Sequence, residues 1–261
     1  MGEIITIANQ KGGTAKTTTA LNLGAALAEA GKKVLLIDFD PQAALTLAHG
    51  IDPLGLEHTI YDVLLGPDLR LSEVVVSTQN GPDLAPSNID LAGAEVELLG
   101  QIGRETFLRE KLSALAAEYD FILIDCPPSL GLLTINGLAA ADEVLIPVQT
   151  QYFAFKALQQ LLNIISKVKA KSNRKLKIGG FLPTMYQTRT RHSQEVVDEL
   201  KAAFGNQVYD IIIKRTVKFP DSVVVTQEDF EEPPEARSIL RFDPKSVHAE
   251  AYRQLAREVI K

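Results

Sequence analysis

NQKGGTAKTTTALN, residues 9–22, joins an apolar run to a segment with helical periodicity. The run EIITIA at 3–8 predicts a buried strand, and residues 16–30 predict a helix that ends at Gly31. Paired glycines, a lysine and a threonine between a strand and a helix are typical of a phosphate-binding loop. The strict pattern G-x-x-x-x-G-K-S/T is not met, because Gln10 and Ala15 stand at its two glycine positions.

This loop nevertheless carries the groups that bound phosphate needs. Gly12 and Gly13 let backbone N–H groups turn inward, and the N-terminus of the following helix adds the positive end of its dipole. Lys16 would reach the β- and γ-phosphates, and the Thr17 hydroxyl would face Mg²⁺. The alternative is an ordinary glycine-rich turn that contains a lysine by chance.

Three aspartates end apolar runs elsewhere in the chain. Asp38 and Asp40 end LLIDFD, and Asp125 ends FILID. Ligands bind α/β sheets at the carboxyl ends of buried strands, so we expect these carboxylates to face the loop and serve Mg²⁺ and catalysis. A lone aspartate at such a point is often a helix cap or a turn residue, and for Asp38 that alternative stays open.

Apolar runs and helical patterns alternate along the chain. Further strands are predicted at 32–38, 121–125, 143–148, 177–184 and 207–213, and further helices at 90–118, 130–141, 152–170, 192–204 and 246–260. Near-continuous apolar strands are typical of a parallel sheet covered on both faces. We therefore expect an α/β fold, a doubly wound and mainly parallel sheet flanked by helices on both faces, as in P-loop nucleoside triphosphatases. Residues 50–90 and 219–237 predict irregular segments.

Composition narrows the class of protein. The 261 residues are expected to form one domain, and the early position of the loop leaves no room for an N-terminal helix-turn-helix domain. Cys126 is the only cysteine, which excludes an intrachain disulfide and predicts an inert core thiol. The four histidines lack metal-ligand spacing and are expected at the surface or at caps. No apolar stretch reaches about 18 residues, so we expect a cytoplasmic protein without membrane contact.

Charge is distributed unevenly along the chain. Residues 1–150 hold 8 Lys and Arg against 20 Asp and Glu, a net charge of −12, whereas residues 151–261 hold 19 against 13, a net of +6. From Lys156 to Lys218, 13 basic side chains face 4 acidic ones. This stretch predicts one basic face for a phosphate backbone, although the run at 167–177 taken alone is more typical of a solvated helix end.

KGGTAKTT, IDFDPQ, LIDCPPS, FLPTMYQTRTRHSQEV and FDPKSVHAEAYRQLAREV together resemble the ParA/Soj family of deviant Walker-box partition ATPases, nearly end to end. The resemblance implies ATP, Mg²⁺ and a homodimer with ATP between its subunits. It also implies that Lys16 serves its own nucleotide, that Lys11 reaches the partner's, and that Asp40 positions or activates the attacking water. Contacts are then expected to ATP at Lys11, Gly12, Gly13, Thr14, Ala15, Lys16, Thr17, Thr18 and Met185, and to Mg²⁺ at Thr17, Asp38 and Asp125.

The family's DNA-contacting arginines fall on Arg189 and Lys218, and Arg215 lies close to the second in sequence. This sequence departs from the family pattern at Ala15, at Gln187 and through residues 212–232, which leaves contacts to the edge of the nucleotide open. The absence of interleaved aromatic residues in the basic stretch predicts DNA binding without sequence preference.

The resemblance implies a slow, dimerising, DNA-stimulated ATPase. It would position a chromosome, a plasmid or another cargo over the nucleoid with a ParB-like activator or a cargo adaptor. Three alternatives stay open: a membrane-cycling relative such as MinD, which would need a basic amphipathic tail; a metabolic P-loop enzyme, in which Lys11 has no role in trans; and a nucleotide switch with negligible hydrolysis.

Overall fold

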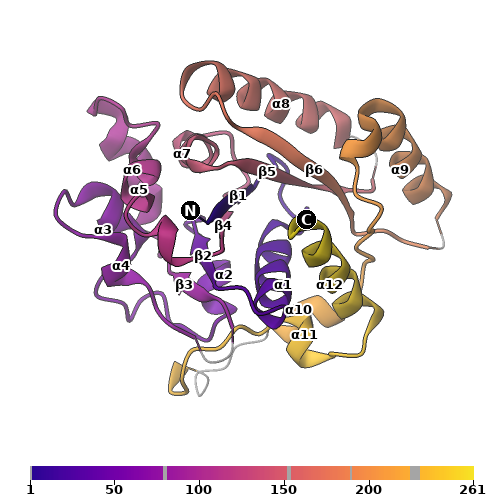
Figure 1. The fold of residues 1–261 in the computed structure, drawn as a ribbon, viewed down its shortest axis with the longest axis horizontal. Helices are drawn as coiled ribbons and strands as arrows, with labels where there is room; N and C mark the ends of the chain where they lie inside the picture. Colours follow the sequence, from indigo (N-terminus) through magenta and orange to yellow (C-terminus); the bar gives the residue numbers. More distant parts are fainter. Residues whose placement is uncertain (1, 79–80, 152–153, 189, 224–229) are drawn as a thin grey trace.

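Six parallel strands form the centre of the computed structural model, which describes residues 2–78, 81–151, 154–188, 190–223 and 230–261. The strand order is β3-β2-β4-β1-β5-β6, which confirms the predicted doubly wound α/β fold (Figure 1). The strands are β1 Glu3–Ile7, β2 Val34–Asp38, β3 Asp83–Ala85, β4 Phe121–Asp125, β5 Glu143–Gln149 and β6 Lys177–Thr184.

The register of the central strands brings the candidate residues together. β4 pairs with β1 on one side and with β2 on the other, so that Asp125 lies opposite both Ile7 and Asp38. Every residue of β2 and β4 is buried, which explains their continuous apolar sequences. The glycine-rich loop follows β1 directly, and it therefore begins beside the two aspartates.

Helices cover both faces of this sheet. The helices α7 and α8 lie on one side of β1 and β5, and α1 and α12 lie on the other (Figure 1). Leu23 and Leu27 of α1 pack with Tyr252 and Leu255 of α12 in one of two hydrophobic clusters. The long helices are α1 Lys16–Glu29, α7 Leu132–Ala140, α8 Ala154–Lys171, α9 Arg191–Phe204 and α12 Val247–Val259.

Two predicted elements are wrong. The helix expected over 90–118 is broken into α5 Leu91–Glu97, α6 Phe107–Leu112 and short 3₁₀ turns, because the backbone becomes extended at Gln101 and Gly103 then adopts a left-handed φ of 74°. The strand expected at 207–213 is not formed. Val208 makes only an isolated bridge to Phe181, and Pro183 of β6 has no N–H with which to extend a ladder.

The segments predicted as irregular contain short elements. Residues 50–90 hold β3, α3 Ile60–Leu65 and α4 Leu71–Val74, and α3 begins with a capping box between Thr59 and Asp62. Nearby lies α2 Ala44–Leu47, and toward the C-terminus lie α10 Lys218–Ser222 and α11 Ile239–Phe242. Within the described ranges, none of the helices has both the length and the apolar character needed to cross a membrane.

Candidate nucleotide site

Hydrogen bonds attach the glycine-rich loop to the ends of the strands β5 and β6. The Asn9 side chain donates to the carbonyl oxygen of Pro147 on β5 at 2.7 Å and accepts from the Lys11 N–H at 3.0 Å. Near the other end of the loop, the Thr184 hydroxyl at the end of β6 donates to the Thr14 carbonyl at 3.0 Å. The strand, loop and helix that a phosphate loop requires are therefore all present.

Ala15 replaces a glycine at a position that requires a left-handed backbone. Its φ is 68° and its ψ 34°, and Gly13 has a similar φ of 70°. A left-handed conformation costs an alanine about 1 kcal/mol, which the anchored loop and the helix beyond it must offset. The departure from the strict motif thus leaves the loop geometry in place.

Lys16 begins α1 and points its charge into a buried site. The residue is 7% exposed. Burial lowers the pKa of its ammonium group, whereas the nearby carboxylates of Asp125 and Asp40 act in the opposite direction. The sequence predicted these three residues at one site, and the fold brings them together.

Asp125 is the strongest indication that a cation belongs here. Both carboxylate oxygens are buried, and neither accepts a hydrogen bond from the described residues. Burial, followed by repulsion from Asp38, raises the pKa of Asp125 well above its usual range, and the nearby Thr17 hydroxyl counteracts this shift although it forms no hydrogen bond of normal geometry with either oxygen. Oxygen ligands from a carboxylate and a hydroxyl suit Mg²⁺. The residues present therefore fit a magnesium ion beside bound phosphate.

The carboxylate of Asp38 already accepts hydrogen bonds from another residue of the chain. Its Oδ2 accepts hydrogen bonds from the backbone N–H of Thr46 at 2.8 Å and from the Thr46 hydroxyl at 2.7 Å. Burial raises the pKa of Asp38 to about 6 despite these bonds. The carboxylate thus anchors α2 to the end of β2, and its role as a direct metal ligand stays a prediction.

Asp40 lies in the loop after β2, and residues that the sequence analysis missed hold it there. The residue is 9% exposed, and its Oδ1 accepts the Gln42 N–H at 3.0 Å. The Ser87 hydroxyl donates to the Asp40 carbonyl at 3.0 Å, and the Ser87 N–H donates to the Thr46 hydroxyl, also at 3.0 Å. Ser87 follows the short strand β3, so the signal was a small polar residue at another strand end.

A cavity of about 730 Å³ adjoins the phosphate loop. It is lined by Thr17 and Thr18 from α1, by Met185 after β6, by Arg215 before α10 and by Phe219 of α10. The volume lies within the usual range for ligand pockets. The predicted ATP contacts Thr18 and Met185 are thus brought together. Arg215, predicted as a DNA contact, lines the same cavity.

Lys11 differs from Lys16 in its surroundings. It is half-buried, beside the exposed Gly12 and Gly13, and within the described part of the chain no carboxylate forms an ion pair with it. The pKa of Lys16 is influenced by Asp125 and Asp40 in its own subunit. The two lysines of the loop therefore lie in different surroundings.

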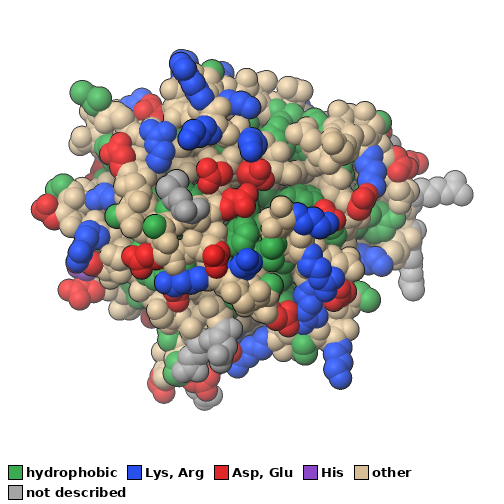
Figure 2. Space-filling model, viewed as in Figure 1, with side chains coloured by type: hydrophobic (Ala, Val, Ile, Leu, Met, Phe, Trp, Pro, Cys, Tyr) green, Lys and Arg blue, Asp and Glu red, His purple; other side chains and the backbone are tan. Residues whose placement is uncertain are grey.

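The predicted single basic face is corrected to two separate groups. The register pairs Lys177 with Glu143 at one end of β6 and Thr184 with Gln149 at the other, roughly 25 Å away. Exposed cations at 167–177 gather over the end of α8 and the start of β6 (Figure 2). Lys218 lies beyond the other end and forms an ion pair with Asp243. Arg189 lies outside the described residues.

The parallel sheet, the anchored loop and the buried carboxylates define a P-loop nucleoside triphosphatase. A family model described as an AAA domain matches residues 2–178. The sporulation initiation inhibitor protein Soj of Bacillus subtilis is 45% identical over 259 residues, 99% of this chain and 98% of the relative. The chromosome-partitioning ATPase Soj of Treponema pallidum is 45% identical over 260 residues, 100% of this chain and 98% of the relative.

A solved structure gives the same picture of the fold. It is that of cobyrinic acid a,c-diamide synthase from Mycobacterium smegmatis with a bound ATP analogue and magnesium, 41% identical with a TM-score of 0.85. The match covers 100% of this chain and 94% of that one. The chain belongs to the ParA/Soj family of deviant Walker-box partition ATPases. It is a magnesium-dependent ATPase, with ATP and Mg²⁺ as its ligands.

Proposed function

We propose that this chain is an ATP-dependent dimerising ATPase that binds DNA without sequence preference. With a ParB-like activator or a cargo adaptor, it positions a chromosome, a plasmid or another cargo over the nucleoid. The observation that carries this proposal is the different setting of the two loop lysines. Lys16 is buried toward Asp125 and Asp40, whereas Lys11 is half-buried beside exposed glycines. A second subunit can therefore be reached by Lys11 without disturbing the phosphate site.

Each residue then has a distinct task. The loop N–H groups and Lys16 hold the phosphates, and Lys11 of the partner subunit stabilises charge that develops during transfer, as an arginine finger does. Asp40 orients the attacking water, and Ser87 fixes the backbone of Asp40. Mg²⁺, when bound, neutralises charge on the β- and γ-phosphates, and Thr17 and Asp125 would hold it. The cavity bordered by Met185 and Phe219 would take the nucleoside.

DNA binding is assigned to the group at the nucleotide end of β6. Arg215 lines the cavity near α10, and Lys218 starts that helix, so bound nucleotide can influence both side chains. Dimerisation doubles the number of phosphate contacts, which raises affinity and its dependence on salt. We also infer that residues 1–261 form a single domain, because α12 near the C-terminus packs on α1 of the phosphate loop.

Size-exclusion chromatography of Asp40→Ala protein tests the proposal, with and without ATP and with and without DNA. We expect an ATP-dependent dimer that binds DNA, because hydrolysis needs the carboxylate while nucleotide binding depends on the loop and Lys16. A protein that stays monomeric at saturating ATP contradicts the assigned role of Asp40. Turnover of the unaltered protein with and without DNA separates this function from a metabolic P-loop enzyme and from a switch that scarcely hydrolyses.

A further inference from the structure

An apolar stripe runs along the exposed side of the α5 segment, defined here as residues 87–105. Its members are Ile89, Val96, Leu99 and Ile102, which are 56%, 70%, 59% and 99% exposed. Ile89 precedes α5, Val96 lies in its last turn, Leu99 lies in the 3₁₀ turn that follows it, and Ile102 lies just beyond that turn. The buried residues Leu91, Ala94 and Leu98 of the same segment pack into the core. The stripe is therefore a second apolar side that the fold leaves in solvent.

Carboxylates border this stripe. The segment contains Asp90, Glu95, Glu97 and Glu105, whereas Arg104 is its only basic residue. Arg104 is engaged within the segment, because it pairs with Glu105 and donates to the Leu99 carbonyl. Glu97 is exposed and accepts a hydrogen bond from the Tyr61 hydroxyl at 3.0 Å. The segment thus combines exposed apolar side chains with a net negative charge of its own.

The α5 segment is also connected to both catalytic loops. Ser87 at its start holds the Asp40 carbonyl. Glu95 accepts the Leu133 N–H at 3.2 Å, at the start of the helix that follows the Asp125 loop. The carbonyl of Arg104 near its end accepts from the Asn136 side chain in that same helix at 2.7 Å. A partner that binds the stripe can therefore shift the positions of Asp40 and Asp125.

We propose that the α5 stripe is the docking surface for a cationic amphipathic segment of the activating partner. The proposal rests on the proposed function and assigns its activator a place. Charge complementarity selects this occupant, because basic residues beside an apolar helix face would meet Asp90 and Glu97. A symmetric contact between two copies of the stripe would bring the same carboxylates together and is disfavoured. Docking here changes ATP turnover through Ser87 and Glu95.

A synthetic peptide of 18 residues tests this assignment. It carries leucine at three- and four-residue spacing and lysine elsewhere, and a scrambled peptide of the same composition is the reference. Fluorescence anisotropy measures its affinity for the full chain with an ATP analogue, and phosphate release measures turnover. The variant Val96→Ser/Leu99→Ser/Ile102→Ser removes the apolar side chains, Asp90→Asn/Glu97→Gln removes the charge, and Leu54→Ser is the matched control at a residue 82% exposed elsewhere.

We expect the triple variant to weaken binding of the patterned peptide at least about tenfold and to abolish its effect on turnover, with basal turnover unchanged. The charge variant should weaken binding at low salt, and Leu54→Ser should change neither quantity. Equal peptide affinity of the triple variant and the unaltered protein overturns the proposal. So does loss of the ATP-dependent dimer in the triple variant, which would assign the stripe to a second copy. DNA binding without peptide reports separately on the proposed function.

Discussion

Ala15 holds a backbone conformation that disfavours its own side chain. Its φ of 68° lies in the left-handed region, where glycine is the usual residue. We expect Ala15→Gly to raise the free energy of unfolding by up to about 1 kcal/mol, since relief of strain exceeds the entropy that glycine adds to the unfolded chain. Urea unfolding measures this change. Ala20→Gly, in the middle of the same helix, is the control and should lower stability by about 1 kcal/mol or more.

Replacement of each of the two loop lysines should have a different effect on ATP binding. Lys16→Ala removes the buried charge of the phosphate site, so we expect loss of ATP affinity by a factor of at least about 100. Lys11→Ala should leave nucleotide binding by the monomer within about threefold and abolish dimerisation and turnover. Equilibrium titration with a fluorescent ATP analogue measures the first effect, and light scattering the second. An equal loss of affinity in both variants would refute the division into cis and trans roles.

His49 is a buried histidine, whereas the sequence predicted the histidines at the surface or at caps. It is completely buried, its Nδ1 lies 2.7 Å from the Leu45 carbonyl, and its Nε2 has no partner among the described residues. Burial lowers its pKa to about 4. The unfolded chain therefore binds a proton at a higher pH than the folded protein does. The stability that depends on neutral His49 is complete above pH 6.5 and is lost as the pH falls toward 4.

Because His49 is protonated more readily in the unfolded chain, we expect the free energy of unfolding to fall by about 3 kcal/mol between pH 6.5 and 4. His49→Asn keeps a polar group near the Leu45 carbonyl but cannot be protonated. The difference in unfolding free energy between the two proteins should therefore change with pH over this interval and level off below it. Urea unfolding at several pH values measures the difference. A difference that stays constant with pH would show that His49 is accessible to protons in the folded state.

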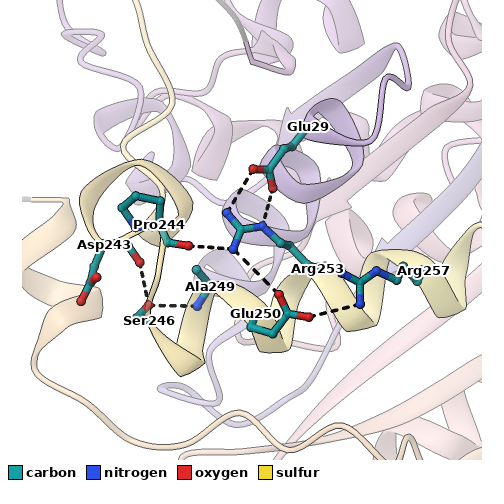
Figure 3. Close-up of polar contacts among 8 residues, drawn as sticks. All are labelled: Glu29, Asp243, Pro244, Ser246, Ala249, Glu250, Arg253 and Arg257. Carbon is teal, nitrogen blue, oxygen red and sulfur yellow. Dashed lines mark hydrogen bonds and ion pairs between the residues drawn. The ribbon is translucent and has the colours of Figure 1, made fainter.

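At the scale of elements, α12 is attached to the helix of the phosphate loop by a polar contact at the edge of an apolar interface. Arg253 of α12 donates from Nε to Glu29 of α1 at 2.7 Å and from a terminal nitrogen at 3.0 Å (Figure 3). Its other terminal nitrogen donates to the Pro244 carbonyl at 2.7 Å. Beneath this contact, Tyr252 and Leu255 are completely buried. The apolar packing sets the stability, and Arg253 sets the register between the two helices.

Arg253→Ala should lower the free energy of unfolding by about 1 kcal/mol. Arg253→Lys should recover less than half of that loss, because lysine cannot form the two parallel bonds to Glu29. Glu29 is half-exposed, which limits the energy of the pair. A double-mutant cycle with Glu29→Ala isolates the pair. A coupling energy of zero would assign the whole effect of Arg253 to its other contacts, with Pro244 and Glu250.

The segment at 207–213 shows what hydrophobic periodicity cannot predict. The apolar run at 207–213 has the composition of a strand, and Ile211 and Ile213 are indeed buried. They are buried by packing against the cluster of α1 and α12, without a ladder to β6. Periodicity reports which residues are buried. It does not report whether the neighbouring strand offers the N–H groups that a ladder needs. Here Pro183 of β6 has no N–H to donate.

The whole molecule separates its basic residues into two groups, and DNA binding should distinguish them. Lys218→Gln, at the nucleotide end, should weaken ATP-dependent binding to all DNA sequences and lower the salt slope by about one for each protomer. Lys175→Gln, at the opposite end of β6, should have little effect. Asp243→Asn should strengthen binding, because it frees Lys218 from its ion pair.

A filter-binding titration across salt concentrations measures all three effects. ATP affinity serves as the control, and it should not change in any of these variants by more than about twofold. A stronger effect of Lys175 than of Lys218 would move the DNA surface to the far end of the sheet. Sequence preference in the unaltered protein would contradict binding through phosphate contacts alone.

The sequence by itself determined the sheet, the phosphate loop and the ligands ATP and Mg²⁺ of this protein. Near-continuous apolar runs of this length are typical of strands buried on both faces, and a glycine-rich turn between such a strand and a helix leaves N–H groups free for phosphate. These are local constraints, so residues 9–22 and the aspartates at strand ends were sufficient to predict them.

Only the tertiary structure decided what depends on distant segments. The register of β2 and β4 placed Asp38 beside Asp125, and the Thr46 hydrogen bonds turned Asp38 into an anchor. The length of β6 separated basic residues that are neighbours in sequence, and the break after α5 left an apolar stripe in solvent. All of these outcomes have the same physical reason. They depend on hydrogen bonds and packing between strands and helices that are far apart in the chain, and the local sequence pattern does not show which distant segment will be the neighbour.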